Sequence, residues 1–232
     1  MRRPLFLILF AAVLSGPVAA QTYPARPVTL IYPFGTSAAE VWMRQIAGEM
    51  QKNLGQPMVV ENRPGAGGRL GMIAMTTGKP DGYQLSIATT SMLVYSPLTS
   101  ASFKPAPVKD YAPVTQVYNL KLAWYASAGL PFRDAKGLVE YAKANPGKLN
   151  FGSTGVGSTG HFALELLNAV AGTQIAHIPY KGEAELIQAT LSGDIHLFFT
   201  SGGAKGQVDA GKLQVIGTSG DTRWKLFPDR PT

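Results

Sequence analysis

The chain has 232 residues, 45% of them hydrophobic, and carries 21 Lys and Arg against 14 Asp and Glu with no cysteine. This length allows one large domain or two small ones, and the lack of cysteine excludes a disulfide-stabilised fold. The basic residues are scattered and do not interleave with aromatic residues, so the sequence does not indicate a nucleic-acid partner.

Residues 1–20 have the layout of a secretory signal peptide. Arg2 and Arg3 precede an apolar run from Leu5 to Leu14, and Val18–Ala20 supplies small residues for cleavage before Gln21. The apolar run is about half the roughly twenty residues that a membrane span needs. We therefore expect this segment to be removed and the mature chain to be periplasmic.

The rest of the chain alternates between short β-like runs and longer helical stretches. This alternation predicts an α/β fold with parallel sheets covered by helices on both faces. Residues 101–113 contain three prolines and no periodicity, and form either a connection between two lobes or a long surface loop. The expected strands are 27–32, 58–61, 83–89, 120–126, 148–152, 174–179, 194–200 and 213–217; the expected helices are 38–53, 70–77, 135–144, 161–171, 183–192 and one after Gly203.

Four loops that follow predicted strands are candidate ligand sites. In open α/β sheets, ligands lie beyond the carboxyl ends of the strands, where free N–H groups at helix N-termini attract anions. The candidate contacts are Phe34, Gly35, Thr36, Ser37 and Glu40 in the first loop, Thr89 and Ser91 in the second, and Thr200 in the fourth.

The third loop, residues 152–161, is rich in glycine and hydroxyl groups. Glycine lets the backbone approach a ligand closely, and Ser and Thr hydroxyls are adjustable hydrogen-bond donors. Ser158 or Thr159 is alternatively a cap of the following helix, and the two roles can coexist. A glycine pattern typical of dinucleotide sites is also present, but the next predicted strand ends in Tyr180 and Lys181, where a ribose-binding acid is expected. The candidate contacts here are Ser153, Thr154, Gly157, Ser158, Thr159 and His161.

Catalytic and metal-binding patterns are weak. No Gly-x-Ser-x-Gly sequence is present, and His161, His177 and His196 do not have the spacing of metal ligands. We expect no metal and no cofactor. An enzyme is the least favoured alternative, and Glu40 with His161 is its one plausible catalytic pair.

Several short segments, in a fixed order from Tyr23 to Thr232, resemble the substrate-binding receptors of tripartite tricarboxylate transporters, the Bug family. The resemblance implies a monomeric, two-lobed periplasmic binding protein of type II-like fold, each lobe a mostly parallel sheet flanked by helices. It also implies that loops 34–40 and 153–161 face each other around a small carboxylate. The matching segments are Tyr23–Val28, Pro33–Phe34, Leu54–Pro57, Glu61–Gly68, Pro80–Tyr83, Lys109–Pro113, Ala144–Asn150 and Pro179–Gly182.

The resemblance implies a division into a first lobe over residues 21–120, a second lobe over 121–214, and a return to the first lobe over 215–232. The family usually continues well beyond Thr232, so part of the first lobe is expected to be missing. The implied function is capture of a di- or tricarboxylate, an amino acid or an aromatic acid for a membrane permease. The alternative is a receptor that signals to a sensor kinase.

The chain also departs from the family pattern. The first loop is one residue shorter, Ser37 and Ala38 replace a glycine pair, and Glu40 stands where Asp is usual. Thr200 replaces a frequent Asp, which favours a more anionic ligand. Residues 61–68, with Tyr180 and Lys181, are interpreted as structural in preference to ligand contacts.

Overall fold

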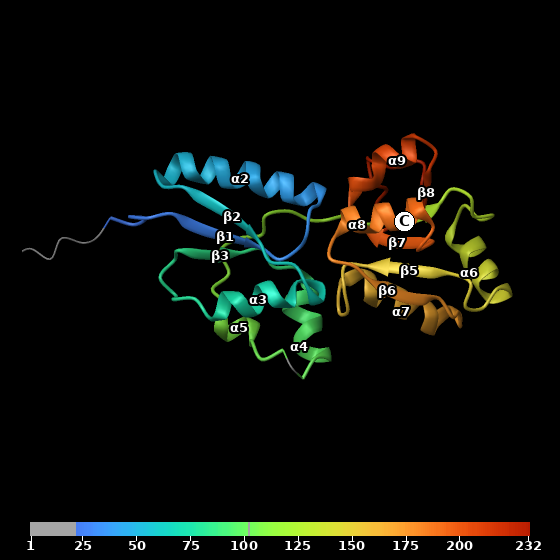
Figure 1. Cartoon of the computed structure of the whole chain (residues 1–232), viewed down its shortest axis with the longest axis horizontal. Coiled ribbons are helices and arrows are strands. Elements are labelled where there is room, and N and C mark those ends of the chain that lie inside the picture. The colour runs from blue at the N-terminus through green and yellow to red at the C-terminus, as the bar shows by residue number, and fades with distance from the viewer. Residues whose placement is uncertain (1–21, 102) are drawn as a thin grey trace, which may run out of the picture.

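The computed structural model describes residues 22–101 and 103–232 and shows two α/β lobes side by side, connected by an extended segment (Figure 1). The first lobe is coloured blue to green, and the second yellow-green to red. The expected signal peptide and its cleavage point before Gln21 lie outside the described residues.

The first lobe contains a three-stranded sheet. Its elements are β1 (Val28–Tyr32), α2 (Ala38–Leu54), β2 (Met58–Asn62), η1 (Ala66–Gly68), α3 (Arg69–Thr76), β3 (Gln84–Ser86), the π-helical turn η2 (Ser91–Tyr95), α4 (Ser96–Thr99) and α5 (Pro107–Asp110). The strands are parallel in the order β2-β1-β3. Figure 1 shows α2 and α3 on opposite sides of this sheet. All three strands therefore end at one edge, which faces the second lobe.

Local sequence sets both ends of α2. Ser37 caps its N-terminus, because the Ser37 hydroxyl accepts a hydrogen bond from the N–H of Glu40 at 3.2 Å. Gly55 ends it with a φ of +68°, a left-handed conformation that favours glycine, and its N–H donates to Gln51 O. Ala47, on the inner face, packs with Val28 in the core of the lobe.

The second lobe contains a five-stranded mixed sheet. Its elements are β4 (Ala123–Ser127), α6 (Ala135–Ala144), β5 (Asn150–Ser153), α7 (Thr159–Ala171), β6 (Ala176–Pro179), α8 (Glu183–Ser192), β7 (Leu197–Thr200), η3 (Gly202–Ala204), α9 (Lys205–Asp209) and β8 (Leu213–Thr218). The strand order is β6-β5-β7-β4-β8. Two clusters of buried side chains, one with Leu186 of α8 and one with Leu164 of α7, form the core.

The α/β class with mostly parallel sheets is confirmed, and β4 is the exception to the parallel arrangement. This strand is antiparallel to both β7 and β8. It is the first strand after the crossing from the other lobe, so it enters the sheet at the edge where β7 ends. It must then run in the opposite direction to β7.

The expected return to the first lobe at residue 215 differs from what the structure shows. β8 pairs with β4, and Ser219 N donates to Leu122 O at 2.7 Å. Phe227 is 6% exposed and packs against Tyr125 in the core of the second lobe. Residues 213–216 are all buried, so this strand is stabilised inside the second sheet.

The crossing between the lobes begins only at the end of the proline-rich segment 101–113. Phe103 is buried in a first-lobe cluster with Met72, and Tyr111 donates to Met72 O at 2.9 Å. Residues 111–122 then cross without regular secondary structure. Along this path Tyr118 contacts the exposed Trp42 of α2, with ring centroids 6.3 Å apart.

Candidate functional site

The carboxyl ends of the parallel strands of both lobes meet at the interface between the lobes. The loops after β1 and β2 leave this edge in the first lobe, and those after β5 and β6 do so in the second. Gly35 N donates to Lys181 O at 3.3 Å, and a Cβ on Gly67 would lie 2.8 Å from Ser158 N. These contacts gather the N-terminal ends of α2, α3, α7 and α8. Free N–H groups at helix N-termini favour anions, so the interface has the electrostatics of an anion site.

The contacts pair the loops differently from the expected opposition of 34–40 and 153–161. Gly35 packs on Gly182, in the loop between β6 and α8. The glycine-rich loop instead meets Gly67, since a Cβ on Gly155 would lie 2.7 Å from Gly67 N. Two neighbouring loops of each lobe take part, because β1 is next to β2 in one sheet and β5 is next to β6 in the other.

The first loop is held by its own side chains. The hydroxyl of Ser37, besides capping α2, shares a 2.7 Å hydrogen bond with the phenol of Tyr32. Burial raises the pKa of Tyr32 to about 12; the bond to Ser37 opposes the rise, and Tyr118, Glu40 and Glu183 add to it. Tyr32 therefore stays protonated, between carboxylates from both lobes.

Phe34, Gly35 and Thr36 form the tip of the first loop. The rings of Tyr32 and Phe34 lie edge to face, 5.7 Å apart. Gly35 touches the second lobe, and Thr36 is exposed. Ligand contact by these residues stays a prediction.

Glu40 lies in the first turn of α2 and is 8% exposed. Its Oε1 accepts two hydrogen bonds from Arg44, at 2.7 and 2.9 Å. Arg44 also donates to Asn62, whose amide donates to Phe34 O at 3.2 Å. Among buried side-chain polar atoms of the described residues, Glu40 Oε2 alone has no hydrogen-bond partner. Buried polar atoms are normally paired, so this oxygen can accept a hydrogen bond from a ligand.

The serines of the glycine-rich loop are engaged within the second lobe. Ser153 is fully buried; its hydroxyl shares a 2.6 Å hydrogen bond with Nε2 of His177 and accepts one from Gly155 N at 3.1 Å. Ser158 caps α7 by accepting from His161 N at 3.3 Å. The capping alternative is therefore confirmed for Ser158.

Two histidines, His161 and His177, make hydrogen bonds with residues of this loop. Nδ1 of His161 accepts a hydrogen bond from Gly157 N at 3.2 Å, and its Nε2 lies 3.6 Å from Oε1 of Glu165. The rings of His161 and His177 are 4.2 Å apart. Burial lowers the pKa of His177 to about 4, and His161 adds to the decrease. His177 is thus neutral at pH 7 and positions Ser153.

The second and fourth loops also have clear local roles. The hydroxyls of Thr89 and Ser91 share a 2.8 Å hydrogen bond at the start of η2. Thr200 is 9% exposed at the end of β7. The next residue, Ser201, donates to both carboxylate oxygens of Glu183 at 3.0 and 3.1 Å, which ties this loop to α8. Ligand contact through Thr89, Ser91 or Thr200 stays a prediction.

Three interface residues were missed by the sequence reasoning: Gly67, Arg69 and Gly182. The first two lie in or next to the segment 61–68, which was interpreted as structural, and Gly182 follows Lys181. The signal available was a glycine cluster immediately before a helix, the same signal that identified the loop 152–161.

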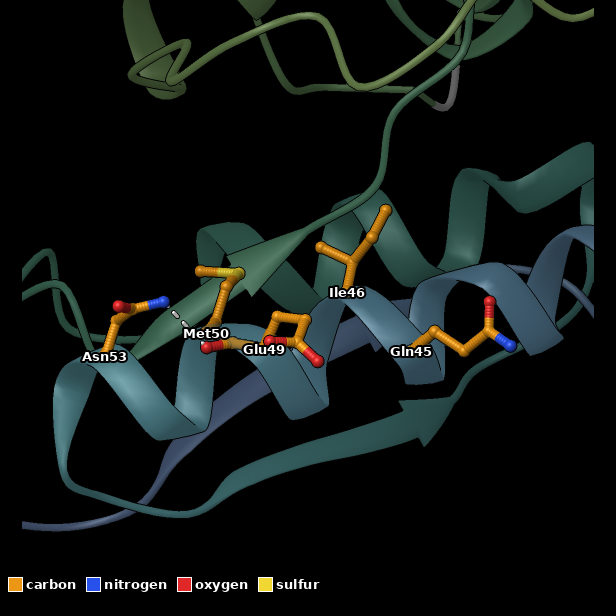
Figure 2. Close-up of a pocket in the computed structure, with 5 residues that line it drawn as sticks. All are labelled: Gln45, Ile46, Glu49, Met50 and Asn53. Atoms are coloured by element: carbon orange, nitrogen blue, oxygen red, sulfur yellow. Dashed lines mark hydrogen bonds between the residues drawn. The ribbon is translucent and has the colours of Figure 1, made fainter.

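The hollow drawn in Figure 2 lies along α2, and all its lining residues come from that helix: Gln45, Ile46, Glu49, Met50 and Asn53. A second hollow is lined by residues that precede β1, among them Tyr23 and Arg26, and by residues that precede β3, among them Asp81. Neither hollow contains a predicted site residue.

Within the described ranges, no group of three or more acidic, His or Cys side chains could hold a metal ion. In the same ranges, no helix has both the length and the apolar character to cross a membrane.

Comparison with known sequences identifies close relatives. Residues 42–232 match the model of the family described as tripartite tricarboxylate transporter family receptor. A UPF0065 protein in the gbd 5' region of Cupriavidus necator is 36% identical over 223 residues, which cover 95% of this chain and 67% of that protein. Protein BugT of Bordetella pertussis is 32% identical over 229 residues, which cover 97% of this chain and 70% of that protein. The chain thus spans about two thirds of the length of its curated relatives.

Solved structures show the same fold. The periplasmic binding protein BugD, Rpa4515 of R. palustris with adipate, and MatC of Rhodopseudomonas palustris with bound malate each align with a TM-score of 0.84. Their sequence identities are 28%, 28% and 26%. Each alignment covers 90% of this chain and 71 or 72% of the other.

Proposed function

Because the chain belongs to the tripartite tricarboxylate transporter receptor family, we propose that it is a periplasmic receptor that binds a small carboxylate between its lobes. It delivers this ligand to the membrane subunits of a tripartite tricarboxylate transporter. The observation that carries the proposal is the convergence of helix N-termini from both lobes on one interface. Structural neighbours with adipate and malate support the ligand class.

The residues at the interface offer several donors to a carboxylate. The hydroxyls of Thr36, Thr154 and Thr159 make no hydrogen bond within residues 22–101 and 103–232. Ser37, Ser153 and Ser158 also make local hydrogen bonds, which fix the shape of the loops. The ligand is therefore held by threonine hydroxyls and backbone N–H groups at the starts of the helices.

Transport requires that the closed form bind the ligand more tightly than the open form. Contacts between the lobes at Gly35 and Gly67 involve backbone atoms, so the lobes must separate to admit and release the ligand. The family and its solved relatives are binding proteins, not enzymes. Glu40 and His161 accordingly have structural partners, Arg44 and Gly157.

A thermal-shift experiment tests the proposal. The chain is heated with malate, adipate, citrate, an amino-acid set and an aromatic-acid set, with sodium sulfate at equal ionic strength as the control. A ligand at 100-fold excess over its Kd adds roughly 2.7 kcal/mol of stability, which raises the melting temperature by several degrees. A melting temperature that stays at the sulfate value with every member of the panel would refute carboxylate binding.

A further inference from the structure

Arg69 is the first residue of α3 and lies at the interface between the lobes. The four residues before it have positive φ angles: Gly65 at 131°, Ala66 at 49°, Gly67 at 65° and Gly68 at 92°. In the described part of the chain, Ala66 is the one non-glycine residue in this region of φ. This tightly wound backbone places the start of α3 directly against the second lobe.

The guanidinium group of Arg69 reaches the glycine-rich loop of the opposite lobe. A Cβ on Gly157 would lie 3.4 Å from a guanidinium nitrogen and 3.6 Å from Cζ. Within the described ranges, the Arg69 side chain has no hydrogen bond and no ion pair. By contrast, Arg26, Arg44 and Arg63 pair with carboxylates at 3.1, 2.7 and 2.7 Å. Arg69 is therefore a cation that faces the other lobe without a counter-charge.

Three backbone N–H groups of the glycine-rich loop are already used in hydrogen bonds within the second lobe. Gly157 N donates to His161, and Gly155 N donates to Ser153. Ser158 N donates to Gly155 O at 3.1 Å. These three N–H groups are therefore not available to an anion beside Gly157, whereas the five N–H donors of Arg69 are.

We propose, resting on the function proposed above, that Arg69 binds one carboxylate of the ligand and makes the receptor selective for dicarboxylates over monocarboxylates. A guanidinium group binds a carboxylate through two parallel hydrogen bonds, which are stronger than bonds between neutral groups. The threonine hydroxyls and helix N-termini bind the other carboxylate. A monocarboxylate satisfies only one of these two positions and leaves Arg69 without an anion.

Isothermal titration calorimetry with pairs of equal chain length tests this selectivity. The pairs are adipate with hexanoate, and succinate with butyrate. Arg69→Gln should weaken binding of the dicarboxylate about ten- to a hundredfold, the range of a charge-assisted hydrogen bond. It should change monocarboxylate binding less than about threefold. Arg69→Lys keeps the positive charge but lacks the planar guanidinium group that makes two parallel hydrogen bonds, so its loss of dicarboxylate affinity should be intermediate.

The matched control is Arg63→Gln, in the same segment. Arg63 already pairs with Glu61, so its replacement should leave the preference unchanged. The melting temperature of Arg69→Gln should equal that of the unsubstituted chain, because Arg69 has no partner to lose. A dicarboxylate preference that survives in Arg69→Gln overturns the inference and leaves the proposed function intact. No binding of any panel member by the unsubstituted chain overturns the proposed function, and the inference falls with it.

Discussion

Gly67→Ala would separate the lobes at the point where their backbones touch. Gly67 has a φ of +65° and a ψ of +25°, so alanine there loses about 1–2 kcal/mol of stability from the left-handed conformation alone. Its Cβ would also lie 2.8 Å from Ser158 N, which is closer than such atoms pack, and 3.1 Å from Ser158 Cα, which is a tight contact. Since Ser158 belongs to the other lobe, opening of the lobes relieves this overlap without unfolding either one.

Gly55→Ala is the matched control for this substitution. Gly55 has a φ of +68°, and no atom lies within 4 Å of an added Cβ. Both variants should therefore lose a similar free energy of unfolding in chemical denaturation. Only Gly67→Ala should increase the radius of gyration in small-angle X-ray scattering and weaken binding of a carboxylate ligand. Equal radii of gyration for the two variants would refute the contact between the lobes at Gly67.

Three further predictions concern stability. Phe227→Ala should lower the free energy of unfolding by about 3–5 kcal/mol, because the side chain is buried in the core of the second lobe. A loss below about 1 kcal/mol would show that the segment after β8 does not pack in this lobe. Ser158→Ala removes the cap of α7 and should lower the free energy of unfolding, measured by denaturant titration, by about 1 kcal/mol. Thr154→Ala removes a hydroxyl that has no partner in the described ranges and should leave this free energy unchanged. Equal changes in the two variants would contradict the capping role. The pKa of His177 is about 4 in the folded state and 6.5 in the unfolded state, so its contribution to stability, on the order of 1 kcal/mol after solvent screening, is present above pH 6.5 and lost as the pH falls toward 4. His177→Asn should remove this dependence of the free energy of unfolding on pH. A variant with the same pH dependence would contradict the role of His177.

Local signals predicted several elements well. The expected helices 135–144 and 183–192 have the bounds found in α6 and α8. Asp134 caps the first of these, and glycines flank the second. The short elements between residues 91 and 110 were missed, because helices of four or five residues have too few positions to show a period.

The candidate site was predicted in part. The glycine-rich loop and the first loop do lie at the interface between the lobes, as their position after strands indicated. The hydroxyls of Ser153 and Ser158 are bonded to His177 and to the start of α7, and ligand contact by these serines stays a prediction. Partners that lie far along the chain, such as His177, leave no local mark in the sequence around Ser153.

The sequence by itself determined the alternation of strands and helices, the helix caps and the positions of the glycine turns, because each of these depends on a few neighbouring residues. Only the tertiary structure decided that Gly67 meets Ser158, that Arg69 faces Gly157, and that β8 remains in the second lobe. These contacts join residues far apart in the chain, and they depend on the order in which the strands pair. Strand order is set by the packing of the whole lobe, which no single segment encodes.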